Sequence, residues 1–385
     1  MAEPELEPME EPPSPPPSDS YSSPEFDKDR HVTFLQMMYE LLPWQYQSQE
    51  INRLTLAYFV ISGLDLLSSI DRVDKDTVTS WVLSFQAHPK SEDEPNDGQF
   101  YGFHGSRTSQ FPGESRGVMS HNGSHLASTY CALSILKIVG YNLSSIDSEM
   151  MLTSMRNLQQ PDGSCSRALA QTALHLSTQV DGGFMPIHIG AETDLRFMYC
   201  AAAICFMLED WRGMDKEKAK EYIINCQSYD GGFGLTPGSE SHGGATYCAV
   251  ASLRLMGFIG DDLLSNSATS SIVNVPLLLS WILQRQAMNG GFQGRPNKDS
   301  DTCYAFWVGA TLRILGGLKF IDEKELHGFL LTCQYEFGGF SKFPGQFPDL
   351  YHSYYGITAF SLLGESGMSS LCVELGITDQ AATGI

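Results

Sequence analysis

The sequence predicts an all-α protein, an α/α barrel of about six inner and outer helix pairs. The first observation is a repeat, because Gly-Gly-Phe recurs at intervals of roughly fifty residues. The copies begin at Gly182, Gly231, Gly290 and Gly338. The second observation is that each of the last three copies separates a polar helix from a more apolar one. Such helix pairs stack side by side, and without obvious polar end caps the array is expected to close into a ring.

Polar helices that end in glutamine precede three of the Gly-Gly-Phe turns. They are expected over residues 215–227, 274–286 and 322–334. Asp215, Asn274 and Asp322 are residue types that cap helix N-termini. Pro276 stands in the first turn, where proline is tolerated. These helices have one polar face and are therefore assigned to the outer layer.

A more apolar helix follows each turn and is assigned to the inner layer. These helices are expected over residues 125–139, 196–208, 247–256, 303–315 and 353–363. Gly140, Gly257, Gly316 and Gly364 follow four of them, as helix C-caps do. The glycine-rich loops lead into the N-termini of the inner helices, which should gather around one mouth of the barrel. Their partial positive charges favour an anion there.

The chain divides into three predicted segments. Residues 1–29 are acidic and rich in proline and serine, which indicates a disordered tail. Residues 30–366 form the barrel, and residues 367–385 form a C-terminal tail. Residues 165–181 separate two turn-like segments and break the repeat, so they are predicted to be an insertion that loops out.

Composition excludes several classes of protein. A net charge of -21 argues against nucleic-acid binding. The chain has no apolar run of the ~20 residues that span a bilayer and no signal peptide at its start, so we expect a cytoplasmic protein without stable membrane insertion. The nine cysteines show no disulfide framework. Cys131, Cys200, Cys205 and Cys248 lie in apolar segments and are predicted to be buried, reduced thiols.

Asp301, Cys303 and His352 have the chemistry of zinc ligands. Residues two apart do not share a helix face, so Asp301 must lie at the cap and Cys303 in the first turn if they are to converge. His352 stands at the start of the next inner helix. Three protein ligands leave a fourth position for substrate, which is typical of a catalytic site. A buried thiol, a helix cap and a polar core residue are the alternative for these three.

Four hydrogen-bond donors are expected at the same mouth and would suit a diphosphate leaving group. They are His242, Arg295, Lys298 and Tyr304. Gly243 and Gly244 would allow substrate to approach the backbone, or would serve only the turn. Some aromatic residues of the inner helices should line an apolar cavity, because the centre of such a ring is too wide to fill. The candidates are Tyr130, Phe197, Tyr199, Tyr247, Phe306, Trp307 and Tyr354.

The block Gly-Arg-Pro-x-Lys at 294–298, followed by Asp-x-Cys-Tyr-x-Phe-Trp at 301–307, resembles the β subunits of the protein prenyltransferases. The closest resemblance is to the type I geranylgeranyltransferases, over residues 28–366 apart from the insertion. It implies a zinc enzyme with an obligatory α subunit. The reaction would transfer geranylgeranyl from geranylgeranyl diphosphate to the cysteine of C-terminal Cys-aliphatic-aliphatic-X sequences, as in small GTPases.

The resemblance also implies roles for individual residues. Zinc is held by Asp301, Cys303 and His352. Diphosphate is bound by His242, Arg295, Lys298, Tyr304 and Lys342, with a lysine of the α subunit. The prenyl pocket is formed by Thr55, Arg196, Tyr199, Gly243, Gly244 and Trp307. The peptide pocket is formed by Phe59, His125, Ala127, Phe197 and Tyr351.

Two positions separate the members of this family. Thr55 stands where farnesyltransferases have a tryptophan at the pocket floor, which favours the longer geranylgeranyl chain. Lys342 stands where the farnesyl enzyme has a magnesium-binding aspartate, so no Mg²⁺ requirement is expected. Tyr351 and Tyr355 depart from the animal type I pattern and resemble the farnesyl enzyme.

The sequence leaves four alternatives. A farnesyltransferase β subunit is disfavoured by Thr55 and Lys342. The type II, Rab-modifying enzyme fits the N-terminal helical region poorly. A terpene cyclase of the same fold would need an Asp-rich motif, which is not seen. A non-catalytic protein that keeps these motifs is possible because of the insertion at 165–181.

Overall fold

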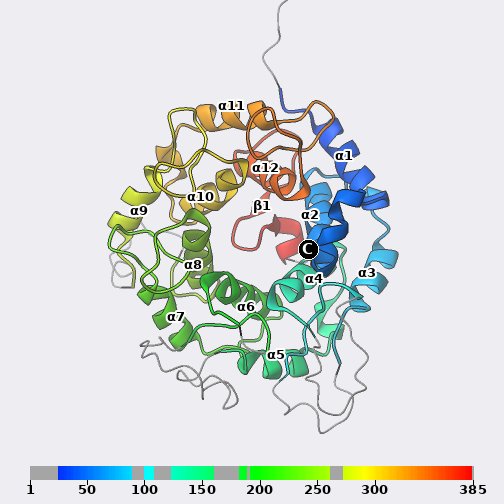
Figure 1. Cartoon of the computed structure of the whole chain (residues 1–385). Helices are drawn as coiled ribbons and strands as arrows, with labels where there is room; N and C mark the ends of the chain where they lie inside the picture. The colour runs from blue at the N-terminus through cyan, green and yellow to red at the C-terminus, as the bar shows by residue number, and fades with distance from the viewer. Residues whose placement is uncertain are drawn as a thin grey trace, which may run out of the picture.

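Six helices form a closed inner ring in the computed structural model, which describes residues 25–88, 99–107, 123–159, 182–188, 191–260 and 272–383. They are α2 (Arg53–Leu66), α4 (Leu126–Ile138), α6 (Leu195–Met207), α8 (Gly243–Leu255), α10 (Thr302–Ile314) and α12 (Leu350–Leu362). Each packs against the next, and α12 packs against α2, which closes the ring (Figure 1). The predicted α/α barrel is therefore confirmed.

The outer layer consists of a helix beside each inner one (Figure 1). These are α1 (Lys28–Glu40), α3 (Lys75–Leu83), α5 (Ser148–Arg156), α7 (Lys216–Asn225), α9 (Val275–Leu283) and α11 (Glu323–Cys333). Short 3₁₀ segments connect some of them, η1 (Trp44–Asn52), η2 (Ile70–Arg72), η5 (Leu143–Ser145) and η7 (Leu318–Phe320). The side chains of Asp215, Asn274 and Asp322 accept first-turn N–H groups, so all three predicted caps are confirmed. None of the described helices is long and apolar enough to cross a membrane.

The glutamine at the end of an outer helix joins neighbouring repeats. The Gln286 side-chain amide donates to the carbonyl of Gly290 in its own turn at 3.0 Å and to the carbonyl of Asp322 at 2.8 Å. Its oxygen accepts from the Asp322 N–H at 2.9 Å. Gln159 makes the same contacts with Gly182 and Asp215. One side chain thus satisfies backbone groups of two repeats, which explains why this position carries glutamine.

The last of these glutamines closes the outer layer. Gln334 accepts from the N–H of Asp27 at 3.1 Å and donates to the carbonyl of Glu25 at 3.0 Å. Asp27 in turn caps α1, and the Phe26 ring packs on Phe360 with centroids 4.4 Å apart. The predicted tail boundary at residue 29 is therefore wrong, because residues 25–29 belong to the ring. Residues 1–24 lie outside the described part.

His31 lies in this closure and predicts a pH dependence of stability. Its ring is buried, Nδ1 accepts from the Gly339 N–H and Nε2 lies 3.0 Å from the Gln334 oxygen. Burial lowers the pKa of His31 from 6.5 to about 4, despite the opposing hydrogen bond to Gln334. The unfolded chain thus binds more protons between these pH values, so stability falls as pH drops through this window, by about 3 kcal/mol in full.

Urea unfolding at pH 7.5 and pH 5 tests this effect. The loss of stability at pH 5 should be smaller in His31→Gln than in the unmodified protein, because the titrating group is gone. Burial lowers the pKa of His125 to about 4 as well, so some loss remains. His88 is exposed, and His88→Gln should keep the unmodified slope. An unchanged slope in His31→Gln would contradict the prediction.

The C-terminal segment enters the centre of the ring (Figure 1). Strands β1 (Leu371–Cys372) and β2 (Ile377–Thr378) pair antiparallel, and α13 (Asp379–Thr383) follows. Leu375 and Ile377 are fully buried. The predicted tail over 367–385 is therefore wrong for residues 367–383, because apolar side chains of this segment pack inside the ring. The predicted insertion at 165–181 lies outside the described residues.

Candidate functional site

The first turns of the inner helices meet at one end of the ring. His242 at the start of α8 lies 3.0 Å from the Tyr304 hydroxyl of α10. Asp301 at the start of α10 lies 3.3 Å from Nε2 of His352 in α12. The caps of the inner helices other than α2 have ionisable side chains that accept backbone N–H groups. They are His125, Asp194, His242, Asp301 and Asp349.

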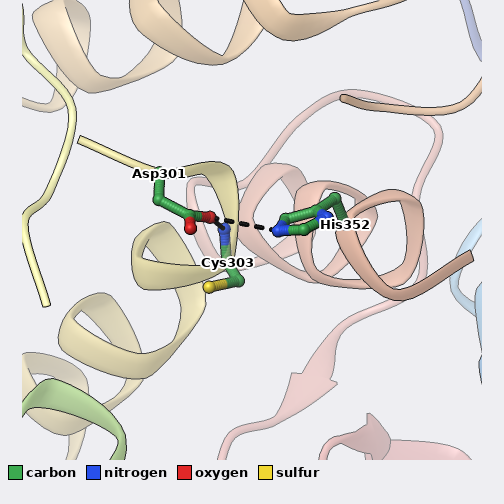
Figure 2. Close-up of side chains that lie close together, drawn as sticks. All are labelled: Asp301, Cys303 and His352. Atoms are coloured by element: carbon green, nitrogen blue, oxygen red, sulfur yellow. Dashed lines mark hydrogen bonds and ion pairs between the residues drawn. The ribbon is translucent and has the colours of Figure 1, made fainter. Parts of the chain in front are cut away.

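Asp301, Cys303 and His352 converge as the sequence predicts (Figure 2). One oxygen, the sulfur and one ring nitrogen lie within 4.8 Å of one another. Asp301 is the cap of α10 and accepts the Cys303 N–H at 2.9 Å. A residue pair two apart therefore shares one site because the first member precedes the helix.

Burial and the neighbouring side chains shift the pKa of all three residues in this cluster. Burial, followed by the Asp301 carboxylate, raises the pKa of the Cys303 thiol well above its usual range. Burial opposes ionisation of Asp301, but hydrogen bonds from His352 and the Cys303 N–H outweigh it and lower its pKa. Burial lowers the pKa of His352, but hydrogen bonds to Asp301 and Asp349 outweigh this effect and raise the pKa to about 9. Metal binding would release the protons of the thiol and the imidazolium, and a thiolate, an imidazole and a carboxylate at this spacing would then match the ligand chemistry of Zn²⁺.

Asp349 orients His352 and was not assigned a role from the sequence. Its carboxylate oxygen lies 2.6 Å from Nδ1 of His352. The Nδ1–H therefore donates to Asp349, which leaves Nε2 as the ring nitrogen that faces Asp301 and could bind a metal. The Asp-x-x-His spacing at a helix start is the signal that could have identified it.

Asp349→Asn tests this role. The affinity for zinc should fall by about tenfold or more, since carboxylates that orient ligating histidines contribute this much. Zinc affinity is measured by competition with a chromophoric chelator. Asp322→Asn makes the same change at the cap of α11, away from the cluster, and should leave the affinity unchanged. Equal affinities in both variants would contradict the assignment.

His242 and Tyr304 form a directed pair. Nδ1 of His242 accepts from the Gly244 N–H at 3.1 Å, so the ring proton is on Nε2. Burial, followed by Arg295, lowers the pKa of His242, which keeps the ring neutral. Nε2–H therefore donates to the Tyr304 oxygen, and the Tyr304 hydroxyl is left to donate its own proton to an acceptor at the mouth.

The remaining predicted anion-binding residues lie near this pair or near the metal cluster. Arg295 contacts the carboxylate of Glu240 at 2.8 Å and is among the charges that act on His242. Lys298 is exposed in the loop before α10. Nζ of Lys342 lies 3.6 Å from Asp301. A binding role for the five residues in the predicted diphosphate site stays a prediction.

An apolar cavity of about 190 Å³ lies next to the first turns. It is lined by six residues of the predicted pockets, Thr55, Phe59, Ala127, Arg196, Tyr199 and Trp307. Four of the other predicted aromatic residues also line it, Tyr130, Tyr247, Phe306 and Tyr354. The predicted buried thiols Cys131, Cys200 and Cys248 complete one wall. Burial raises the pKa of Cys131 to about 12, so this wall is uncharged.

The other predicted pocket residues have specific contacts. His125 and Phe197 pack edge to face with ring centroids 5.6 Å apart. The Tyr351 hydroxyl accepts from the indole N–H of Trp307 at 3.3 Å. A Cβ on Gly243 would lie 3.2 Å from Val308 and 3.3 Å from Tyr304, so helix packing already explains this glycine. Gly244 supplies the N–H that His242 accepts.

Two carboxylates at this end of the ring pair with predicted cations and were also missed. Asp194 is buried and contacts the guanidinium of Arg196 at 2.7 Å. Glu240 pairs with Arg295 as described above. Asp194 caps α6 only two residues before Arg196, whereas Glu240 and Arg295 are 55 residues apart and meet only in the folded mouth. Both ion pairs fix the direction of a guanidinium beside the cavity and the mouth.

Comparisons with known proteins agree with this geometry. Residues 26–377 match the family described as Prenyltransferase alpha-alpha toroid domain. The chain is 65% identical over 370 residues to the geranylgeranyl transferase type-1 subunit beta of Arabidopsis thaliana, covering 96% of this chain and 94% of the relative. The subunit of the same name from Dictyostelium discoideum is 34% identical, over 92% of this chain and 96% of the relative.

A solved structure matches the fold along nearly the whole chain. It is the Candida albicans protein geranylgeranyltransferase-I complexed with GGPP, with a TM-score of 0.77. The match covers 94% of this chain and 98% of the other. At 23% sequence identity it establishes the shared architecture alone.

Proposed function

This chain belongs to the prenyltransferase α/α toroid family as a β subunit of the geranylgeranyltransferase type-1 kind, and we propose that it transfers geranylgeranyl to protein cysteines. The observation that carries the proposal is the position of the Asp301, Cys303 and His352 cluster beside the apolar cavity. Trp307 lines the cavity one helical turn after Cys303 and contacts Tyr351. Residues of the candidate metal cluster and of the apolar cavity wall therefore share one helix, α10.

The reaction is proposed to join the sulfur of a substrate cysteine to C1 of geranylgeranyl diphosphate, with diphosphate leaving. Bound at Asp301, Cys303 and His352, zinc would lower the pKa of the substrate thiol. The Tyr304 hydroxyl, directed outward by neutral His242, donates to the leaving diphosphate. Arg295 and Lys298 add positive charge where charge develops on those oxygens.

The cavity residues hold the prenyl chain and exclude water from it. Thr55, Arg196, Tyr199 and Trp307 serve this role, with Gly243 and Gly244 at the mouth. The peptide end, Cys-aliphatic-aliphatic-X, lies against Phe59, His125, Ala127, Phe197 and Tyr351. An α subunit is required as a partner and contributes a lysine to the diphosphate site.

Lys342 is proposed to replace a magnesium ion. Its ammonium is half-exposed beside Asp301 and can offset diphosphate charge. Turnover should therefore not depend on added Mg²⁺. Lys342→Asp should slow turnover, and millimolar Mg²⁺ should restore part of the rate because the new carboxylate and phosphate oxygens suit that ion.

The matched control for this test is Lys342→Ala, which removes the charge without adding a ligand. It should be slow and should show no rescue by Mg²⁺. Strong stimulation of the unmodified enzyme by Mg²⁺ would contradict the proposal and favour a farnesyltransferase.

The proposed function is tested with the chain co-purified with a prenyltransferase α subunit. Farnesyl and geranylgeranyl diphosphates compete for a free Cys-aliphatic-aliphatic-Leu peptide, and kcat/KM is measured for each. A higher value for geranylgeranyl diphosphate is expected. A farnesyl preference would assign the chain to the farnesyl enzymes, and activity only on an intact Rab protein would assign it to type II.

A further inference from the structure

Five inner helices present a tyrosine hydroxyl to the axis of the ring, in the second turn of each helix. The residues are Tyr58, Tyr130, Tyr199, Tyr247 and Tyr354, and Phe306 takes the corresponding place in α10. All five tyrosines are buried. A buried phenol hydroxyl needs a hydrogen-bond partner.

Their shared partner is the loop of the C-terminal hairpin, residues 373–376, which Figure 1 shows inside the ring. The hydroxyls donate to four consecutive carbonyls. Tyr247 donates to Val373 at 2.8 Å, Tyr199 to Glu374 at 3.0 Å, Tyr130 to Leu375 at 2.6 Å and Tyr58 to Gly376 at 2.9 Å, and Tyr354 also donates to Gly376. Each carbonyl of the loop is thus satisfied by a different inner helix.

The same five rings line the apolar cavity, and so does Gly376. One end of each tyrosine therefore faces the cavity while its hydroxyl holds the hairpin loop. Gly376 has a φ of +68°, and a Cβ there would lie 2.8 Å from the hydroxyls of Tyr58 and Tyr354. The site has no room for a side chain at this position.

We propose that the hairpin loop 373–376 closes the floor of the prenyl cavity through Gly376, and that the five tyrosines hold this loop in place and thereby limit the length of prenyl chain the enzyme accepts. The inference rests on the proposed function and extends it to residues of the C-terminal segment. The catalytic cluster lies in the first helical turn and the tyrosines in the second, about 5 Å further along the helix axis. A fixed floor so close forces the chain to lie across the ring, where Thr55 and its neighbours meet the chain end.

If this floor could move, the prenyl chain could also extend along the axis of the ring. A longer homologue could then bend along the axis instead of ending against the wall. Loosening the loop should therefore relax discrimination against long chains while leaving the catalytic cluster intact. Loss of the Tyr130 and Tyr199 hydroxyls leaves the Leu375 carbonyl without its donor and the Glu374 carbonyl with only a longer contact, 3.4 Å from the Tyr247 hydroxyl. This loss should raise the population of the displaced loop by about tenfold or more.

The test uses Tyr130→Phe/Tyr199→Phe in the complex with the α subunit. Tyr222→Phe is the matched control, because the Tyr222 hydroxyl donates to the carbonyl of Thr193 on the outer layer. Hydrogen exchange of residues 371–379 is measured with and without geranylgeranyl diphosphate. The kcat/KM values for geranylgeranyl diphosphate and for its C25 homologue, geranylfarnesyl diphosphate, are measured in the same preparations.

The double variant should exchange amides in 371–379 about tenfold faster, and its relative kcat/KM for the C25 substrate should rise by a similar factor. Tyr222→Phe should match the unmodified enzyme in both readouts. Gly376→Ala disturbs the loop from its own side and serves as a second variant if the first does not fold. It should give the same two changes.

Faster exchange with an unchanged substrate ratio would overturn the proposal, since the hairpin would then close the ring without limiting chain length. Unchanged exchange in both variants would overturn it as well, because the tyrosines would not be holding the loop. Failure of the unmodified complex to bind or transfer geranylgeranyl would instead refute the proposed function. The two failures are therefore distinguishable.

Discussion

Cys303→Ala should lose its zinc and nearly all of its turnover. The sulfur lies within 4.8 Å of the ligand atoms of Asp301 and His352, and it is the one soft donor among the three. Zinc sites with a full ligand set bind with roughly 10–16 kcal/mol, so one ligand accounts for about 3 kcal/mol, or more than ~100-fold in affinity. The zinc content is measured by atomic absorption. Turnover is measured with saturating prenyl diphosphate and peptide.

The prenyl diphosphate should still bind to this variant, because the cavity and the His242–Tyr304 pair are unchanged. Cys226→Ala removes another buried thiol, at the end of α7, and should keep both zinc and turnover. The assignment fails if Cys303→Ala retains stoichiometric zinc and normal activity.

Thr55→Trp should shift the substrate preference toward farnesyl diphosphate. Thr55 lines the cavity, and its hydroxyl lies 3.7 Å from the sulfur of Cys131. An indole there would fill the space of the last isoprene unit. Five buried carbons are worth up to about 4 kcal/mol, so the ratio of the two kcat/KM values should change by at least tenfold and at most ~1,000-fold.

Thr55→Ser is the matched control, because it keeps a small hydroxyl residue at the same position. Its ratio should stay near that of the unmodified enzyme. An unchanged ratio in Thr55→Trp would show that this residue does not limit the prenyl chain. Farnesyl diphosphate binding should survive in Thr55→Trp, which separates a filled pocket from a misfolded protein.

Much of the fold was predictable because it is local and repeated. The caps Asp215, Asn274 and Asp322 and the glycines after the inner helices act within one helical turn, so their residue types reveal them. The closing of the ring was predictable as well, since it follows from the number of similar helix pairs. The glutamine contacts between repeats were not, because Gln286 and Asp322 are 36 residues apart.

The candidate metal cluster was predictable for a related reason. Asp301, Cys303 and His352 stand at corresponding places in neighbouring repeats, so the period of the chain brings them together. Asp349 and Asp194 were missed because acidic residues near helix starts are common, although their partners His352 and Arg196 are close in the sequence. Glu240 was missed because its partner Arg295 is 55 residues away and meets it only in the folded mouth. The segment boundaries failed at both ends, since composition does not show that residues 25–29 complete the outer layer.

The sequence by itself determined the helix pairs, the closed ring and the three residues of the candidate metal cluster, because periodic burial and capping act over short distances along the chain. Only the tertiary structure decided where the C-terminal segment lies. Its carbonyls at 373–376 meet hydroxyls contributed by five helices, from Tyr58 to Tyr354. No local sequence pattern predicts such a contact, because each tyrosine taken alone is typical of a core aromatic residue. The partners become one site only when the ring brings five distant turns to a common axis.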